Sequence, residues 1–192
     1  MAGDFPELWL VRHGETEWSR SGKHTGRTDI SLTAKGEQDA RALKPRLAEH
    51  SFARVICSPL RRARETCELA GFADRYETDE DLSEWDYGEH EGRRTAEIRS
   101  EHPGWNAFEH GSPGGENLND VAARAERFIG KVRSQEGHVL VFAHRDILRV
   151  IAALWVGWPA IAARRLYMDP ASISRLGYDH SLQEPVLRTL NT

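Results

Sequence analysis

Short apolar runs alternate along the chain with longer segments in which apolar residues recur at helical spacing. Runs of four to seven residues, bounded by turn-forming or charged residues, predict strands over 8–11, 54–57, 138–143, 172–178 and 186–190. Helical spacing predicts helices over 34–50, 59–70 and 146–156. Strands that alternate with helices are typical of an α/β domain with a mostly parallel sheet.

Two of these helices have recognisable beginnings. Thr33 is expected to cap the first helix, and Ser58 with Pro59 forms an N-cap and first-turn pair for the second. Pro45 lies inside the first helix and is expected to kink or divide it, because proline removes a backbone hydrogen bond.

The segment 76–119 has a different character from the rest of the chain. It is rich in acidic residues, Gly, His and Trp, and apolar residues show little periodicity there. Loops of this length inside compact domains are usually functional. We therefore expect one domain over 1–192, with 76–119 as a lid-like insertion above the sheet.

Composition excludes several classes of protein. Hydrophobic residues make up 39% of the 192 and charged residues 29%, as in globular proteins, and no apolar run approaches the ~18 residues of a membrane span. The start has no basic region before its short apolar run, so we expect no secretory signal, a cytoplasmic location and no membrane partner. Cys57 and Cys67 lack zinc or disulfide spacing and are expected to be buried apolar residues.

The charge is unevenly distributed. The net charge of −4 argues against a nucleic-acid partner. Between 41 and 66, seven basic residues stand against two acidic ones, whereas 77–120 holds thirteen acidic residues against three arginines. A local arginine cluster in an acidic chain suits a small anionic ligand, and the acidic segment predicts an acidic rim that discourages polyanions.

Residues that could bind an anion or take part in catalysis follow three of the predicted strands. The first strand ends in Arg12, His13 and Gly14, Arg62 comes shortly after the second, and His144 follows the strand VLVFA directly. Each could separately be a surface charge or a satisfied strand-end residue. Because parallel strands place their carboxyl ends at one edge, the set predicts a pocket matched to a phosphoryl group.

A proton donor would complete such a pocket. Glu84 is the best candidate, although it could also be one more solvated acid in an acidic stretch. A neutral imidazole is a competent nucleophile near pH 7. We expect the other ring nitrogen of His13 to donate to a backbone carbonyl, which would fix the tautomer.

Four segments, LVRHGETEW, SPLRRARET, LSEWDYGEHEG and VFAHRD, together resemble the histidine phosphatase superfamily, the phosphoglycerate mutase-like group. They follow the family's order and span most of the chain. The resemblance implies a Rossmann-like three-layer α/β/α sandwich, no metal or other cofactor, and a covalent phosphohistidine. It further implies that His13 is the nucleophile, that Arg12, Arg62 and His144 hold the phosphoryl oxygens, and that Glu84 is the proton donor.

The family contains phosphatases and mutases, and the substrate loops of this chain favour a phosphatase. The mutases have asparagine at the position of Ser19, FSGW at 24–27, and Gly-Asn where this chain has Arg145 and Asp146. The loops instead look similar to fungal sedoheptulose bisphosphatase and actinobacterial acid phosphatases. We therefore expect a phosphomonoesterase for small metabolites such as sugar phosphates or bisphosphates, with Ser19, Thr25, Gly26 and Arg145 as further substrate-binding residues.

Several alternatives remain open on the sequence. Arg145 could bind a second phosphate or carboxylate, or could pair with Asp146 or Glu84. Five aromatic and histidine residues could line the pocket rim or pack the insertion onto the sheet, namely His24, Trp85, Tyr87, His90 and Trp105. The six tryptophans are compatible with a homodimer contact or with core packing. A mutase, an idle phosphate-binding module and a metallohydrolase are the competing functions; the last is disfavoured because Arg12 and Arg62 would repel a metal ion.

Overall fold

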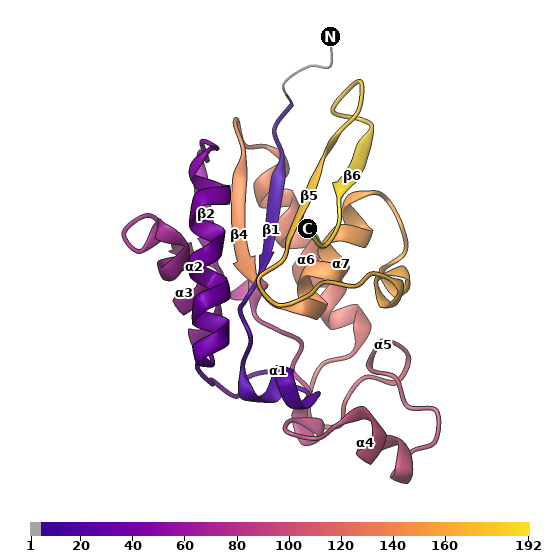
Figure 1. The fold of residues 1–192 in the computed structure, drawn as a ribbon. Helices are drawn as coiled ribbons and strands as arrows, with labels where there is room; N and C mark the ends of the chain where they lie inside the picture. The colour runs from indigo at the N-terminus through magenta and orange to yellow at the C-terminus, as the bar shows by residue number, and fades with distance from the viewer. Residues whose placement is uncertain (1–4) are drawn as a thin grey trace.

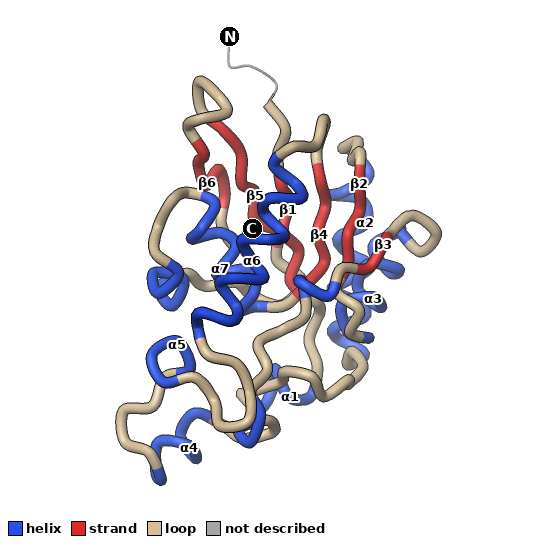
Figure 2. The backbone as a smooth tube through the Cα atoms, turned by 180° about the vertical axis from the view of Figure 1, so that it is seen from behind, coloured by secondary structure: helices blue, strands red, loops and turns tan. Residues whose placement is uncertain are grey.

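Six strands form one mixed sheet in the order β3-β2-β4-β1-β5-β6 in the computed structural model, which describes residues 5–192. The strands are β1 (Leu8–Arg12), β2 (Arg54–Cys57), β3 (Glu77–Thr78), β4 (Val139–Ala143), β5 (Ile173–Tyr178) and β6 (Pro185–Thr189). Strands β1 to β4 are parallel to one another, whereas β5 runs antiparallel to β1 and β6. Figure 2 shows this order across the sheet, and the mostly parallel arrangement predicted from the sequence is confirmed.

Helices cover both faces of the sheet, as a three-layer sandwich requires. On one side lie α2 (Ala34–Ala48) and α3 (Arg61–Cys67), and on the other α6 (Leu118–Arg133) and α7 (Arg145–Trp155) (Figure 1). The alternation of side chains along β1 explains the two layers: Leu8 and Leu10 join the apolar cluster with α6 and α7, while Trp9 and Val11 join the cluster with α2 and α3. The predicted α/β/α fold class is confirmed.

A division of the first helix at Pro45 and a cap at Ser58, both predicted from the sequence, are wrong. Pro45 neither divides nor ends α2, because Leu43 and Leu47 on either side of it are buried against the sheet and hold the helix in place. Ser58 does not cap α3, which begins at Arg61 after Leu60. The Ser58 hydroxyl instead lies 2.7 Å from Nε2 of His144 and accepts only a long bond from the backbone of Leu60.

The segment 76–119 contains the edge strand β3 and short helical pieces. These are the 3₁₀ turns Glu80–Leu82 and Gly88–His90 and the helices α4 (Thr95–Glu101) and α5 (Ala107–His110). Leu82, Trp85 and Ile98 are fully buried and belong to the same apolar cluster as β1 and α7. The segment is therefore anchored to the core, and α4 and α5 lie beyond the carboxyl ends of β1 and β4 (Figure 1).

Several further elements lie outside the sequence predictions. A short helix, α1 (Glu17–Ser21), follows β1 and has Thr16 as its cap. α6 follows the acidic segment, a π-helical turn over Glu68–Phe72 follows α3, and a 3₁₀ helix over Ala160–Arg165 follows α7. Among residues 5–192, no helix is both long and apolar enough to cross a membrane. Cys57 and Cys67 are buried and unpaired, as expected, and Trp158 is the one tryptophan in this range that is exposed.

Candidate active site

The carboxyl ends of three neighbouring parallel strands place the candidate residues next to one another. Arg12 of β1 pairs in register with Ala143 of β4, so His13 and His144 follow at the same level, with ring centroids 5.1 Å apart. On the other side of β4, β2 leads into α3, and Nε of Arg62 donates to Nδ1 of His144 at 3.0 Å. The structure thus brings together Arg12, His13, Arg62 and His144.

His13 is held in one tautomer by its own neighbour. Its Nδ1 lies 2.7 Å from the carbonyl oxygen of Gly14, which can only accept, so Nδ1 carries the proton and Nε2 does not. This is the hydrogen bond expected from the sequence. Burial first, and then Arg62 and Arg12, lower the pKa of His13 well below its ordinary value. The imidazole is therefore neutral near pH 7, with Nε2 available as a nucleophile.

Gly14 allows the backbone after His13 to approach the start of α2. A Cβ atom at Gly14 would lie only 2.6 Å from the carbonyl oxygen of Gly36. The Gly14 N–H donates to Oγ1 of Thr66 at 3.0 Å, and the Thr66 hydroxyl donates to the carbonyl of Arg62 at 2.7 Å. These contacts fix the turn that carries His13 against α3.

Arg12 has one side of its guanidinium group free of protein partners. Nη1 donates to the carbonyl of Met168 at 2.7 Å, whereas Nε is buried and has no hydrogen-bond partner among residues 5–192. Burial, followed by the nearby charge of Arg145, lowers the pKa of Arg12 to about 10, so the group stays charged at neutral pH. A guanidinium binds two phosphoryl oxygens through adjacent N–H groups, and the free Nε of Arg12 suits this geometry.

Arg62 and His144 are both fully buried and already bonded within the protein. Nη1 and Nη2 of Arg62 donate to the carbonyls of Thr28 at 3.0 Å and Gly26 at 2.9 Å. Because Nε of Arg62 donates to Nδ1 of His144, the proton of the neutral His144 ring resides on Nε2, which faces the Ser58 hydroxyl. Burial, and next Arg62, lower the pKa of His144 well below its ordinary value. Neither residue lines the open cavity described below.

Glu84 is buried with its carboxyl group against the first turn of α7. Its oxygens accept from the backbone N–H groups of Asp146 at 3.2 Å, Ile147 at 3.1 Å and its own neighbour Trp85 at 2.9 Å. Such bonds favour the carboxylate, but burial and then the charge of Asp146 outweigh them and raise the pKa of Glu84. A raised pKa suits a carboxyl group that has to deliver a proton.

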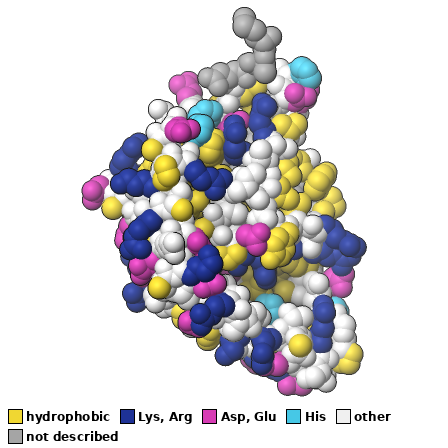
Figure 3. Space-filling view, viewed as in Figure 1, with side chains coloured by type: hydrophobic (Ala, Val, Ile, Leu, Met, Phe, Trp, Pro, Cys, Tyr) yellow, Lys and Arg dark blue, Asp and Glu magenta, His cyan; other side chains and the backbone are white. Residues whose placement is uncertain are grey.

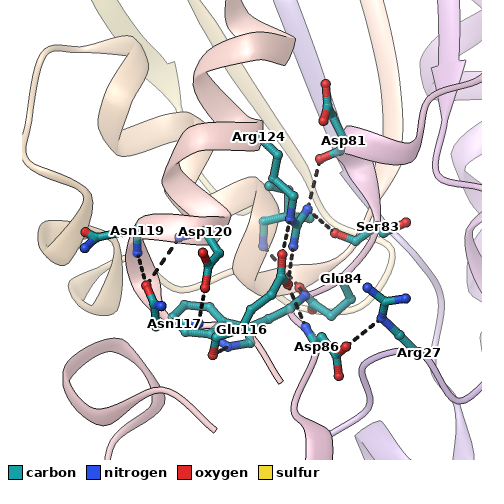
Figure 4. Close-up of polar contacts among 12 residues, drawn as sticks. Arg27, Asp81, Ser83, Glu84, Asp86, Glu116, Asn117, Asn119, Asp120 and Arg124 are labelled. Atoms are coloured by element: carbon teal, nitrogen blue, oxygen red, sulfur yellow. Dashed lines mark hydrogen bonds and ion pairs between the residues drawn. The ribbon is translucent and has the colours of Figure 1, made fainter. Parts of the chain in front are cut away.

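A buried ion pair clamps the loop on both sides of Glu84. Arg124 of α6 pairs with Glu116 at 2.8 Å and donates to the carbonyl of Ser83 at 2.5 Å. Oε2 of Glu116 accepts from the N–H of Asp86 at 2.8 Å, and its backbone carbonyl accepts from Nε1 of Trp85. Figure 4 shows Arg124 and Glu116 beside the stretch that carries Glu84. The position of Glu84 therefore depends on α6 as well as on α7.

One cavity of about 100 Å³ collects most of the predicted site residues. Arg12, His13, Ser19, Thr25, Glu84 and Arg145 line it, together with Gly22, Lys23, His24, Tyr87 and Thr95. The Ser19 hydroxyl is engaged with the backbone of Thr16, with which it forms a capping box at the start of α1. Gly26 contributes its carbonyl to Arg62, and a Cβ there would lie 2.3 Å from Glu91.

The residues considered for the rim divide into two groups. His24 and Tyr87 line the cavity, whereas Trp85, His90 and Trp105 are buried within the insertion, with the rings of His90 and Trp105 4.7 Å apart. The expected acidic rim is wrong: Glu84 is the one acidic residue in the lining, opposite three cations. Most acidic residues of 77–120 are paired with basic side chains, such as Asp86 with Arg27 and Glu101 with Arg93.

Several residues of the site escaped the sequence analysis. Lys23 and Thr95 line the cavity, and Asp146 lies buried behind it with its carboxylate bound by Arg145, Arg149 and the hydroxyl of Tyr87. Arg145 pairs with Asp146, one of the alternatives considered for it, and it also lines the cavity. Asp146 lies two positions after the candidate His144, at the start of a predicted helix, and the sequence indicated it only as a possible ion-pair partner of Arg145.

Comparisons with known proteins agree with this geometry. Residues 8–191 match the family model "Histidine phosphatase superfamily (branch 1)". The chain is 37% identical to an acid phosphatase of Mycobacterium tuberculosis, in an alignment that covers 92% of this chain and 89% of the relative. It is 35% identical to a sedoheptulose 1,7-bisphosphatase of Saccharomyces cerevisiae, in an alignment that covers 79% of this chain and 68% of the relative. It is also 33% identical to a probable phosphoglycerate mutase, GpmB, of Salmonella choleraesuis over 91% and 86%.

A solved structure of the open reading frame Rv3214 from Mycobacterium tuberculosis superposes with a TM-score of 0.91 at 36% identity, covering 97% of both chains. The family match spans nearly the whole chain, and the relatives named as phosphatases cover most of it. The protein is a phosphoric monoester hydrolase, and it belongs to the histidine phosphatase superfamily.

Proposed function

We propose that this enzyme hydrolyses small phosphorylated metabolites, sugar phosphates or bisphosphates, through a phosphohistidine on His13. One observation carries the proposal: the cavity presents a neutral His13 with Nε2 free, beside an Arg12 whose Nε has no protein partner. A nucleophile and a charged oxygen binder at one wall of a small cavity suit a phosphate monoester. The acid phosphatase and sedoheptulose 1,7-bisphosphatase names of relatives support the substrate class.

In the first step, Nε2 of His13 attacks the phosphorus atom and the bond to the ester oxygen breaks. Arg12 binds the phosphoryl oxygens and offsets the charge that develops on them. Glu84, which lines the same cavity, donates its proton to the departing alkoxide. The products of this step are the alcohol, a phosphorylated His13 and an ionised Glu84.

In the second step, a water molecule attacks the phosphorus atom from the position that the alcohol has left. Glu84 accepts a proton from this water, the bond between phosphorus and Nε2 breaks, and inorganic phosphate and neutral His13 are restored. The hydrogen bond from Nδ1 to the Gly14 carbonyl stabilises the positive charge of the phosphorylated ring.

Arg62 and His144 support these steps from the protein side. The ring centroid of His144 lies 5.1 Å from that of His13, and burial together with the charge of Arg62 keeps His13 unprotonated. We assign to Arg62 the electrostatic stabilisation of the transferred phosphoryl group and to His144 the positioning of Arg62, because the hydrogen-bonding groups of both side chains are taken by protein partners. Ser19 and Thr25 shape the wall that faces the alcohol, and Gly26 fixes Arg62 through its carbonyl.

The test is phosphate release from sugar phosphates, sugar bisphosphates, phosphoglycerates and p-nitrophenyl phosphate in the presence of EDTA. Wild type, His13→Ala and the matched control His110→Ala, an exposed histidine outside the cavity, are assayed side by side. We expect release by wild type and His110→Ala only. Equal activity in His13→Ala would show that the nucleophile is wrong, and loss of activity with EDTA would show that a metal takes part.

The intermediate and the proton donor can be tested separately. Labelled substrate should leave an acid-labile, base-stable phosphoryl group on wild type and none on His13→Ala. Glu84→Gln should lose far more activity toward sugar phosphates than toward p-nitrophenyl phosphate, because p-nitrophenolate leaves without protonation. An equal loss for both substrates would remove Glu84 from the role of acid.

A phosphoglycerate mutase activity is the second candidate, because a probable mutase is among the relatives. The same assay separates the two. A phosphatase releases inorganic phosphate from phosphoglycerates, whereas a mutase converts one isomer into the other and requires a phosphorylated enzyme at the start. Isomer formation without phosphate release would favour the mutase.

A further inference from the structure

The lining of the cavity has more positive charge than one phosphoryl group requires. Arg12, Lys23 and Arg145 face it with Glu84 as the one acidic residue. The two histidines of the lining are neutral: burial, and next Arg145, lower the pKa of His24 to about 4. If Arg12 binds the phosphoryl group that His13 attacks, Lys23 and Arg145 are left without a ligand charge.

Arg145 keeps its charge available although it has a protein partner. Its Nε donates to Oδ1 of Asp146 at 3.0 Å, and the same oxygen also accepts from Nη1 of Arg149 at 2.7 Å. One buried carboxylate therefore faces two guanidinium groups, which leaves one positive charge in excess. Nε of Arg149 donates to the carbonyl of Ala163, and Arg149 does not line the cavity. Of the two arginines that bind Asp146, only Arg145 therefore places its positive charge at the cavity.

The position of Arg145 is set before any ligand arrives. Asp146 is 2% exposed and also accepts from the Tyr87 hydroxyl, so it is an immobile anchor. The side chain of Arg145 is 37% exposed, and Nη1 has no hydrogen-bond partner among residues 5–192. A guanidinium that is anchored at Nε and free at Nη1 loses little conformational freedom on binding an anion.

The wall that carries Lys23 is equally well fixed. His24 donates from its backbone to the carbonyl of Arg93 at 2.9 Å, and its carbonyl accepts from Gly92 at 2.9 Å. Its Nε2 lies 3.0 Å from the Thr95 hydroxyl. These bonds join the loop after α1 to the insertion, and Figure 3 shows Lys and Arg side chains at this end of the molecule as well as over the rest of the visible face.

We propose that Arg145 and Lys23 form a subsite for a second anionic group, a phosphate or a carboxylate, on the alcohol part of the substrate. This rests on the proposed function, because His13 and Arg12 must take the phosphoryl group that is transferred. The enzyme then selects doubly anionic metabolites over singly phosphorylated neutral ones. A cavity lined by cations raises the local concentration of such ligands and strengthens their binding.

The experiment compares kcat/KM for two matched substrate pairs. 3-Phosphoglycerate and glycerol 3-phosphate differ by a carboxylate, and fructose 1,6-bisphosphate and fructose 6-phosphate differ by a phosphate. Wild type, Arg145→Gln and Arg145→Lys are compared with Arg27→Gln, which removes the same charge from an exposed residue outside this cavity. The difference between the pairs identifies which anion the subsite takes.

We expect wild type to prefer the doubly anionic member of at least one pair about tenfold or more, as one charge-assisted hydrogen bond allows. Arg145→Gln should remove this preference through KM while changing kcat/KM for the singly charged member less than threefold, and Arg145→Lys should retain part of it. Arg27→Gln should leave the preference unchanged.

Three outcomes would overturn the proposal. Wild type could show no preference within either pair, Arg145→Gln could leave the preference intact, or it could reduce activity toward all substrates equally, which would place Arg145 on the transferred phosphoryl group. In each case phosphate release that depends on His13 would leave the proposed function standing. If wild type released no phosphate from any substrate, the proposed function itself would fail.

Discussion

The carboxyl group of Glu84 accepts a hydrogen bond from the backbone N–H of Asp146 at 3.2 Å, so two buried acidic residues meet at the first turn of α7. Only one of them is ionised easily. Burial by itself would raise the pKa of Asp146, but Arg145 and Arg149 lower it below its usual range, whereas burial and the Asp146 charge raise the pKa of Glu84. The pair therefore separates an acid from a permanent anion.

Asp146→Asn is expected to move the alkaline limb of the pH profile to lower pH. Glu84 has to be protonated to act as an acid, so kcat/KM declines as the pH rises through its pKa. Removing the Asp146 charge lowers that pKa, because the nearby cations Arg12 of β1, Arg62 of α3 and Arg145 of α7 remain. The profile is measured with a singly phosphorylated substrate, so that altered binding at Arg145 contributes little.

Tyr87→Phe is the control for this prediction. It removes the hydroxyl that donates to Asp146 but leaves the carboxylate charge in place. Its alkaline limb should coincide with that of wild type. An Asp146→Asn profile that only loses height, without moving along the pH axis, would show that Asp146 has a structural role alone.

His13 is expected to remain neutral at a pH at which an ordinary histidine is protonated. Burial, Arg62 and Arg12 all disfavour the imidazolium, whereas the Gly14 carbonyl only partly opposes them. The ¹⁵N chemical shifts of the His13 ring, assigned by their loss in His13→Ala, should report the Nδ1–H tautomer and no titration between about pH 5.5 and 8. A titration midpoint near 6.5 would contradict this assignment of charge.

The sequence was sufficient to predict the two strands β1 and β4 that carry the site. Each is a short apolar run, and polar residues follow it directly: Arg12 and His13 after the first run, and His144 after the second. It could not predict that His144 bonds to both Arg62 and Ser58, since these contacts join residues that lie 82 to 86 positions apart in the sequence. The helix α6 was missed although Val121, Ala125, Phe128 and Val132 repeat at helical spacing.

Ion pairing explains why the acidic rim was a wrong expectation. Charges counted along 77–120 ignore partners from elsewhere in the chain, such as Arg124 and Lys131 of α6. The position of Lys23 in the cavity could not be predicted for the same reason, because it depends on hydrogen bonds between two loops that are far apart in the sequence. Local pattern predicts elements, but the neutralisation of a charge depends on the tertiary fold.

Gly14→Ala is expected to lower stability and activity together. The new methyl group would lie 2.6 Å from the Gly36 carbonyl, so the turn after His13 has to move. We expect a loss of about 1–3 kcal/mol in the free energy of unfolding, measured with urea. A loss of at least tenfold in kcat should accompany it, because small shifts of a nucleophile are costly.

Gly130→Ala is the matched control. Gly130 lies on the exposed side of α6, where an added Cβ would meet no atom within 4 Å. Alanine is the better helix former, so the free energy of unfolding should rise by about 0.5–1 kcal/mol with kcat unchanged. Equal stabilities of the two variants would show that the Gly14–Gly36 contact is not tight in solution.

The pair Arg124–Glu116 is expected to act on kcat through the position of Glu84. Glu116→Gln keeps the shape of the side chain but leaves Arg124, whose side chain is 9% exposed, without its carboxylate. The Glu116 side chain is 19% exposed, so the cost in the free energy of unfolding should lie between the ~1 kcal/mol of an exposed pair and the ~3 kcal/mol of a fully buried one. The loop of Ser83 to Asp86 then loses its fixed distance from α7, so kcat should fall severalfold while KM changes little.

The exposed pair Arg94–Glu97 supplies the comparison, since its side chains are 57% and 43% exposed. Glu97→Gln should lower the free energy of unfolding far less than Glu116→Gln does, and it should leave kcat unchanged. If Glu116→Gln loses stability at unchanged kcat, the pair holds the fold without positioning the acid. If kcat falls instead, and the loss is larger for sugar phosphates than for p-nitrophenyl phosphate, the defect lies in proton donation, because only the poorer leaving group depends on Glu84.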